Sequence, residues 1–249
     1  MEEQVKVKSL QKAITLLSCF TMQNPKLGIS ELAKRTGFLK SSVHNMITTL
    51  EACSMIERTP DGKYMLGIRC LCLGSIYRMT RDSNDQIRLA LMELSTMTGE
   101  TVNLAVCRDQ SVIYLDNIRA KASHLMLDYV GETAPLYCTG VGKSILAFLP
   151  HQQQEKELSS ELIAYTQHTI TSPEELRAEL DRIRQVGYAV DRGEHEYDIA
   201  CVAVPILNEY KMPIAAVSVS GLKQYITEER ILEFHKYLVK TADRIRMFL

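Results

Sequence analysis

Long apolar stretches are missing from this sequence of 249 residues. Its longest apolar runs fall short of the roughly 20 residues that a membrane-spanning helix needs. The first residues, MEEQVKVKSLQ, also lack the apolar segment of a secretory signal peptide. We therefore expect a cytoplasmic protein that makes no contact with a membrane.

Ordered cysteine spacing is absent as well. The seven cysteines are scattered, and only Cys70 and Cys72 lie close together. An odd number without metal-ligand spacing favours reduced thiols, as in the cytoplasm, and predicts no metal site. His195 and Glu196 do not form the HExxH pattern of a zinc enzyme.

A catalytic triad could be assembled from Asp191, His195 and Cys201, which lie within eleven residues. Cys201 lies in an apolar run, where cysteines are usually inert, and His195 lies in a charged segment typical of a surface loop. An enzyme remains the rival class of function, but we expect no catalytic residues.

A phosphate-binding P-loop is suggested by Gly-Val-Gly-Lys-Ser at residues 140–144, but it is incomplete. The motif requires a glycine where this chain has Tyr137. We therefore predict no nucleotide cofactor. The segment Ser144–Phe148 reads as a helix that ends before Pro150. A glycine turn before a helix also favours a small anion at the first backbone N–H groups.

Charge is unevenly distributed, although the net charge is only −1. Residues 1–83 carry 12 Lys and Arg against 7 Asp and Glu, and the remaining residues carry 17 against 23. A chain of this length favours two domains. A basic segment joined to a larger acidic one is expected when a nucleic-acid-binding module precedes another domain.

The basic segment has the pattern of a winged helix-turn-helix. SLQKAITLLSCF, ISELAKRTG and LKSSVHNMITTLEACSMI each place apolar residues on one helical face, and Gly37 separates the second and third helices. IERTPDGKYML then alternates around Asp61-Gly62, which predicts a hairpin. Two helices joined by a glycine turn and followed by a hairpin are typical of DNA-binding domains.

Short polar side chains at the start of the third helix could reach base edges, and basic residues could reach phosphates. The predicted partner is double-stranded operator DNA. The candidate residues are Lys40, Ser41, Ser42, His44, Asn45, Arg58 and Lys63.

The rest of the chain predicts a linker helix and an α+β domain. GIRCLCLGSIYRMTRDSND carries an apolar stripe that a monomer would leave exposed, so we expect at least a homodimer reading a pseudo-palindromic site. TVNLAVCRDQSVIYLDNI and ACVAVPILNEYKMPIAAVSVSG each predict two strands with a short connection, and SHLMLDYVG, residues 123–131, predicts another strand. Strands joined in this way favour antiparallel pairing. We predict a DNA-binding domain over residues 1–66, a linker over 67–84 and a sensor domain over 85–249.

At this point the chain resembles the IclR family of bacterial transcription regulators, from about Ser9 to the end. The resemblance rests on SLQKAITLLSCF, ISELAKRTGFLKSSVHNMITTLE, PLYCTGVGKSILAFLP and GYAVDRGEHEYDIACVAVPILNEYKMPIAAVSVSG. It implies a winged helix-turn-helix, a dimerising linker helix, a possible dimer of dimers, and a GAF-like sensor domain for small organic acids. The glycine stretch would then line the effector pocket.

The resemblance also implies the effector-binding residues. The polar ones are Gly140, Val141, Asp191, Cys201, Ser218 and Ser220, and the apolar ones are Met126, Ala134 and Ile199. Independently, Ser218 and Ser220 are two residues apart in a predicted strand and share a face. Hydroxyl and backbone N–H groups can hold a carboxylate without a cationic partner.

Two positions depart from the family pattern. Asn45 stands where many members carry arginine, and Val141 is bulkier than the small residue common there. Asn45 leaves open an alternative, a metabolite sensor that acts through protein contacts and has a degenerate DNA-binding domain. The sequence does not identify the operator, the effector or the sign of regulation.

Overall fold

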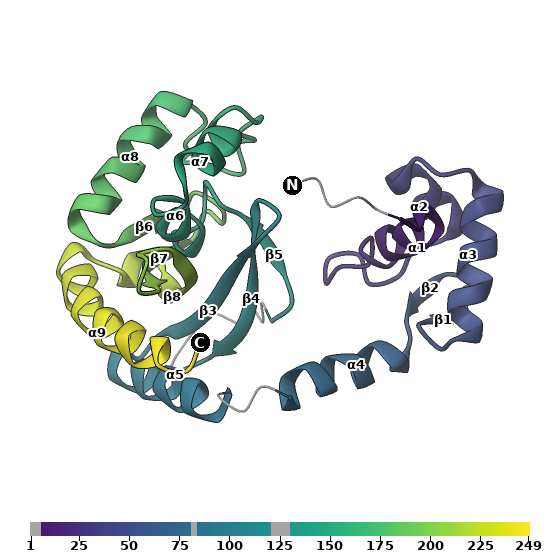
Figure 1. The fold of residues 1–249 in the computed structure, drawn as a ribbon, viewed down its shortest axis with the longest axis horizontal. Helices are drawn as coiled ribbons and strands as arrows, with labels where there is room; N and C mark the ends of the chain where they lie inside the picture. Colours follow the sequence, from purple (N-terminus) through teal and green to yellow (C-terminus); the bar gives the residue numbers. More distant parts are fainter. Residues whose placement is uncertain (1–5, 81–83, 121–129) are drawn as a thin grey trace. The chain divides into compact units, whose positions relative to one another are not determined.

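The computed structural model describes residues 6–80, 84–120 and 130–249. The chain divides into two compact units, Met1–Asp82 and Ser83–Leu249 (Figure 1). Met126 and most of a strand expected over residues 123–131 lie outside the described residues. Each unit is described separately below.

The first unit is a winged helix-turn-helix, as predicted. Its elements are α1 (Lys8–Leu17), α2 (Ile29–Thr36), α3 (Lys40–Ala52), β1 (Ile56–Arg58) and β2 (Tyr64–Leu66). The two strands are antiparallel, with Arg58 opposite Tyr64. Leu16, Leu32 and Ile47 form the centre of its core and are almost fully buried. The apolar faces of three short helices therefore close on one another and on the hairpin.

Glycines form the turns where the sequence predicts them. Gly37 ends α2 with a φ of 70°, and Gly62 lies in the hairpin turn with a φ of 79°. Other residues reach this left-handed region only at a cost, so both turns depend on glycine. The expected wing and the expected break between the second and third helices are both present.

The linker helix α4 (Ile68–Met79) has no buried residue. Ile68, Leu71 and Ile76 have exposed fractions of 59%, 65% and 58%. These positions repeat at helical spacing, so they form one apolar stripe along α4. Within this chain the stripe has no covering element among the described residues.

The second unit is built on one antiparallel sheet of six strands, in the order β5-β4-β3-β8-β7-β6. The strands are β3 (Thr101–Arg108), β4 (Ser111–Ile118), β5 (Thr133–Pro135), β6 (Ala189–Arg192), β7 (Ile199–Leu207) and β8 (Pro213–Leu222). The two long hairpins, β3-β4 and β7-β8, were predicted, whereas β5 was not. Three residues ending in proline give too little alternation to reveal a strand.

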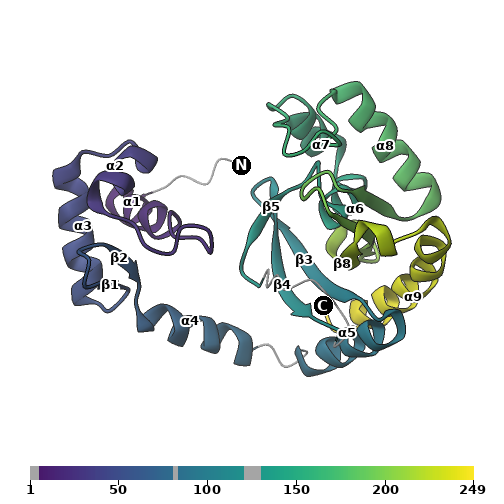
Figure 2. The same ribbon diagram turned by 180° about the vertical axis from the view of Figure 1, so that it is seen from behind.

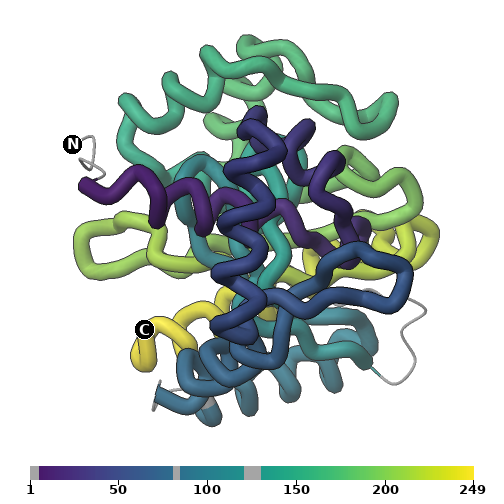
Figure 3. The backbone as a smooth tube through the Cα atoms, turned by 90° about the vertical axis from the view of Figure 1, so that its right-hand side faces the viewer, coloured from purple at the N-terminus to yellow at the C-terminus, as the bar shows by residue number. Residues whose placement is uncertain are grey.

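Helices cover both faces of this sheet (Figure 2). α5 (Asn84–Thr98) and α9 (Glu228–Arg246) pack on one face, over a core of aliphatic side chains. α6 (Gly140–Leu146) packs on the other face, with α7 (His151–Leu158) and α8 (Pro173–Val186) outside it. Figure 3 shows the backbone from another side, with α8 in green toward the top and α9 in yellow below it. The α+β fold class predicted from the sequence is confirmed.

One boundary differs from the expectation. The helix expected to begin at Ser144 begins four residues earlier, at Gly140. The Thr139 hydroxyl caps it by accepting a hydrogen bond from the Gly142 N–H at 3.0 Å. The glycines therefore form the first turn of α6 rather than a loop ahead of it. A short turn elsewhere, Lys223–Tyr225, is a 3₁₀ helix.

No helix in the parts of the chain that the structure describes combines the length and apolar character needed to cross a membrane.

Candidate functional site

The start of α3 presents the polar face expected of a DNA-reading helix. Lys40, Ser41, His44 and Asn45 are exposed there, and Ser42 is half-buried. The opposite face of the helix packs into the core through buried aliphatic residues. The packed face therefore holds α3 in place, and its polar side chains are free to contact nucleotide bases or phosphates.

The wing places its two basic residues on either side of the hairpin turn. Arg58 ends β1 and is exposed. Lys63 precedes β2, and its Nζ lies 3.5 Å from Glu31 Oε2, with both side chains about half exposed. An exposed pair of this kind contributes little, so a phosphate could displace Glu31. Sequence reasoning did not anticipate this competition for Lys63.

In the second unit, the sheet aligns three of the predicted effector residues in one cross-strand row. Asp191 of β6 lies opposite Cys201 of β7, and Cys201 lies opposite Ser220 of β8. Thr101 of β3 continues the row. Directly opposed residues of neighbouring strands share a face, so these side chains meet on the side covered by α6.

A second row runs beside the first. Ser218 of β8 lies opposite Asn103 of β3, and Asn103 lies opposite Asn117 of β4. Asn117 Nδ2 donates a hydrogen bond to Asn103 Oδ1 at 2.6 Å. Asn103 Nδ2 lies 3.1 Å from Ser220 Oγ and 3.4 Å from Ser218 Oγ. Two amides therefore extend the polar patch that the serines begin.

A β-bulge brings Asn117 into this row. The register between β3 and β4 shifts by one residue between Leu104 and Ala105. Without the shift, Asp116 would lie opposite Asn103. Instead Asp116 lies opposite Leu104 and pairs with Arg88 of α5, with 2.6 Å between Arg88 Nη1 and Asp116 Oδ1. The bulge thus directs the amide of Asn117 to the side of the sheet that carries the row and the carboxylate of Asp116 to the opposite side.

The first turn of α6 packs directly over the row. A Cβ added to Gly140 would lie 2.7 Å from the sulfur of Cys201, so only glycine allows this approach. Val141 is buried in the same cluster as Cys201 and Ala134. Ile199, two residues before Cys201, has the same strand parity. The predicted residues that the structure describes are thus brought together, and Met126 lies outside the described residues.

Asp191 carries the most perturbed carboxyl of this patch. It is only 5% exposed. Its Oδ1 accepts hydrogen bonds from the N–H groups of Gly193 at 3.0 Å and Glu194 at 2.7 Å. Burial, with the nearby charge of Glu194, raises its pKa to about 7. Near neutral pH this group can therefore be protonated.

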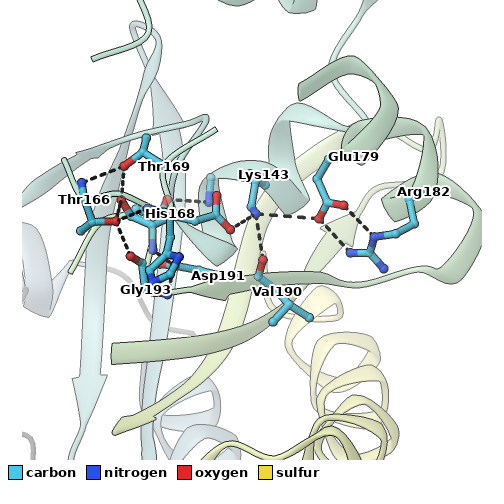
Figure 4. Close-up of polar contacts among 12 residues, drawn as sticks. Lys143, Thr166, His168, Thr169, Glu179, Arg182, Val190, Asp191 and Gly193 are labelled. Carbon is cyan, nitrogen blue, oxygen red and sulfur yellow. Dashed lines mark hydrogen bonds and ion pairs between the residues drawn. The ribbon is translucent and has the colours of Figure 1, made fainter. Parts of the chain in front are cut away.

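Lys143 of α6 is a buried cation whose charge is already balanced (Figure 4). Its Nζ donates to the Val190 carbonyl at 2.8 Å and pairs with Glu194. Glu179 of α8 lies 3.8 Å away and pairs in turn with Arg182. Burial raises the pKa of Glu194, and Lys143 opposes that effect. This network joins α6, α8 and the end of β6.

The segment after α7 holds the loop that carries Glu194. The hydroxyl of Thr166 donates to the Gly193 carbonyl at 2.6 Å, and that of Thr169 donates to the Glu194 carbonyl at 2.6 Å (Figure 4). The ring of Tyr165 packs against His195 with 4.9 Å between centroids. The two threonine hydroxyls and the ring of Tyr165 therefore hold the loop that follows β6 in place.

Comparison with known protein families gives the context of this geometry. The family description "IclR helix-turn-helix domain" matches residues 9–60, and "Bacterial transcriptional regulator IclR C-terminal" matches residues 80–247. The chain belongs to the IclR family. It is therefore a DNA-binding transcriptional regulator with a C-terminal effector-binding domain.

The similarity to individual members of the IclR family extends over nearly the whole chain. It is 31% identical to the transcriptional repressor IclR of Escherichia coli (strain K12) over 245 residues, 97% of this chain and 89% of that protein. It is 33% identical to the regulator KipR of Bacillus subtilis (strain 168) over 229 residues, 92% and 91% of the two chains. The solved structure of an IclR regulator from Alicyclobacillus acidocaldarius matches with a TM-score of 0.87, 26% identity and coverage of 98% and 99%.

IclR-family regulators are not enzymes, and the chemistry of the possible triad agrees. Burial raises the pKa of the Cys201 thiol to about 11, so at neutral pH it is not a thiolate nucleophile. The His195 ring packs on Tyr165. Among the residues that the structure describes, no group of three or more His, Cys, Asp or Glu could hold a metal ion.

Four polar residues of this IclR regulator's sensor domain were missed from the sequence: Asn103, Asn117, Lys143 and Glu194. Asn103 could have been found, because it interrupts an apolar strand at the same parity as Thr101. Asn117 could not, because the bulge changes its parity. Lys143 was considered only as part of an incomplete phosphate motif.

Proposed function

We propose that this protein binds pseudo-palindromic operator DNA as a homodimer in the cytoplasm, and that a small organic acid in the sensor domain changes that binding. The cross-strand row of Asp191, Cys201 and Ser220 beneath the start of α6 carries the proposal. The similarity to the transcriptional repressor IclR of Escherichia coli supports repression as the mode of action. The two activities reside in separate units, so each can be tested by itself.

DNA binding is expected to depend on phosphate contacts from Lys40, Arg58 and Lys63. Each cation that neutralises a phosphate contributes about one unit to the slope of log affinity against log salt. We expect Lys40→Ala to weaken binding to the chain's own upstream DNA and to reduce that slope by about one. Glu51→Ala, on an exposed residue near the end of α3, is the control.

The measurement is a gel shift or fluorescence titration across several salt concentrations. Unchanged affinity and slope in Lys40→Ala would remove this residue from the DNA interface. Absence of specific binding by the wild-type protein would instead favour a sensor that acts through protein contacts, the possibility raised by Asn45.

The chemistry of the row supports an acid as the effector. Ser218 and Ser220 offer hydroxyl hydrogens, and the first N–H groups of α6 have no acceptor within their own helix. Lys143 does not add net positive charge, because it pairs with Glu194. Neutral donors would therefore hold the carboxylate, and protonated Asp191 would avoid repelling it.

Hydrogen bonds to a charged group contribute about 1.5–3 kcal/mol each. We therefore expect Ser220→Ala to weaken binding of the acid by roughly ten- to a hundredfold. Affinity should also fall as pH rises through about 7, since Asp191 then ionises. Asp191→Asn should lessen this pH dependence.

A thermal-shift screen of short aliphatic and aromatic carboxylic acids, followed by calorimetry, tests the effector class. Ser159→Ala, on an exposed serine after α7, is the matched control. If a neutral ligand binds as tightly as any acid, and both row serines can be replaced without effect, the effector assignment is wrong.

The dimer is proposed from the apolar stripe of α4. Ile68, Leu71 and Ile76 are all more than half exposed, and a partner would remove them from water. A two-fold protein also matches a pseudo-palindromic site. Sedimentation should show a dimer, or a dimer of dimers, at micromolar concentration. Leu71→Glu should shift it toward monomer, whereas a stable wild-type monomer would contradict the proposal.

A further inference from the structure

Asn103 is a buried amide at the centre of the polar patch. It is 2% exposed and lies on β3, between Asn117 of β4 and the two serines of β8. Its oxygen accepts from Asn117 Nδ2 at 2.6 Å. Its Nδ2 lies 3.1 Å from Ser220 Oγ and 3.4 Å from Ser218 Oγ. Asn103 thus contacts both serines that we assign to the effector.

These contacts have a direction. An amide oxygen can only accept and an amide nitrogen can only donate. Because Asn117 occupies the oxygen of Asn103, the nitrogen of Asn103 faces the serines. Each serine oxygen then serves as an acceptor toward Asn103, and its hydroxyl hydrogen is left to donate elsewhere.

Among the described residues, an acceptor available to the hydroxyl hydrogens of Ser218 and Ser220 is a weak one, the sulfur of Cys201. Both serines lie close to this sulfur, and their hydroxyl groups lower the pKa of the Cys201 thiol against the larger effect of burial. A thiol sulfur accepts weakly, whereas a carboxylate oxygen accepts strongly. An acid placed over the row would therefore take over these donors.

We propose that Asn103 is a positioning residue that orients the hydroxyls of Ser218 and Ser220 as donors and so makes the effector site selective for a carboxylate over its neutral carboxamide. The inference rests on the proposed effector function. Asn103 itself acts through the serines. The selectivity arises from neutral groups, which fits a patch whose buried cation is already paired with Glu194.

Asn103→Asp reverses the direction with almost no change of shape. In its ionised form the new carboxylate accepts from Asn117 Nδ2 and from both serine hydroxyls, so its buried oxygens keep partners. The serine lone pairs then face the ligand. Binding of an acid should weaken at least tenfold, whereas its carboxamide, whose NH₂ group donates, should bind as well as before or better.

The probes are lactate, pyruvate and benzoate, each compared with its carboxamide, measured by calorimetry on the full-length protein. Asn208→Asp is the matched control, because Asn208 Oδ1 only accepts, from the N–H groups of Tyr210 and Met212. Asn103→Leu removes the amide without adding charge, and should reduce the preference for the acid by a smaller factor.

The outcomes separate the two proposals. An inverted acid-to-amide preference in Asn103→Asp supports the inference. Equal losses for both ligands would indicate only structural damage, and unchanged acid affinity would indicate no role, so either result overturns it. If wild-type protein binds none of the acids but still binds DNA, the acid-effector proposal itself fails, and the inference with it. If Asn103→Asp does not fold, an unchanged preference in Asn103→Leu overturns it.

Discussion

Replacing Asp191 with asparagine should stabilise the sensor domain at alkaline pH. The carboxyl is 5% exposed, and burial raises its pKa from an ordinary 3.8 to about 7. The folded protein therefore keeps a proton that the unfolded chain releases above pH 3.8. Stability must fall as pH rises from about 4 to 7, and the loss should level off above 7.

The size of the effect follows from that difference. Each pKa unit corresponds to about 1.4 kcal/mol. Between pH 5 and 8 the wild type should lose roughly 2–3 kcal/mol that an uncharged residue would keep. Asparagine retains the oxygen that accepts from the N–H groups of Gly193 and Glu194, so the loop geometry is preserved.

Scanning calorimetry of the full-length protein at pH 5 and pH 8 measures this difference. We expect the sensor-domain transition of Asp191→Asn to lie roughly 5–10 °C above that of the wild type at pH 8, with a smaller gap at pH 5. Asp198→Asn is the control, because Asp198 is exposed on the same loop. Parallel behaviour of Asp191→Asn and wild type across this pH range would refute the reasoning, as would a wild type that is more stable at pH 8.

Two further predictions concern α6. Gly140→Ala should destabilise the sensor domain by about 1–3 kcal/mol in urea unfolding, because the new Cβ lies 2.7 Å from the Cys201 sulfur. Adding Cys201→Ala should restore most of that loss; additive losses would show that the two residues do not collide. Lys143→Met should cost roughly 3–5 kcal/mol, because it leaves Glu194 buried without its cation. A second change, Glu194→Gln, should recover part of it, and no recovery would mean that packing rather than charge is responsible.

Much of the fold follows from local patterns in the sequence. Helical spacing and the glycines at 37 and 62 suffice to predict the winged helix-turn-helix, and alternation suffices for the two long hairpins. Each of these patterns is contained within a few neighbouring residues, so it can be recognised without knowledge of the fold. β5 was missed because its three residues gain their strand geometry from pairing with β4, which is a long-range effect.

The site was predictable to a different extent. The family resemblance supplied Asp191, Cys201 and Ser220, and strand period 2 independently linked Ser218 to Ser220. The row that unites them depends on the registers of three strands, which no local pattern encodes. The ion pair between Lys143 and Glu194 joins residues 51 apart in sequence, so it too emerges only from the fold.

The bulge between β3 and β4 gives strand register a chemical meaning. It places Asn117 opposite Asn103 and leaves Asp116 to pair with Arg88. If the hairpin register continued without the bulge, Leu115 would lie opposite Leu104 and the carboxylate of Asp116 would lie opposite Asn103 in the row. A regulator of this kind could thus evolve toward a different class of inducer through a shift of strand register in one hairpin, with every residue that touches the ligand left intact.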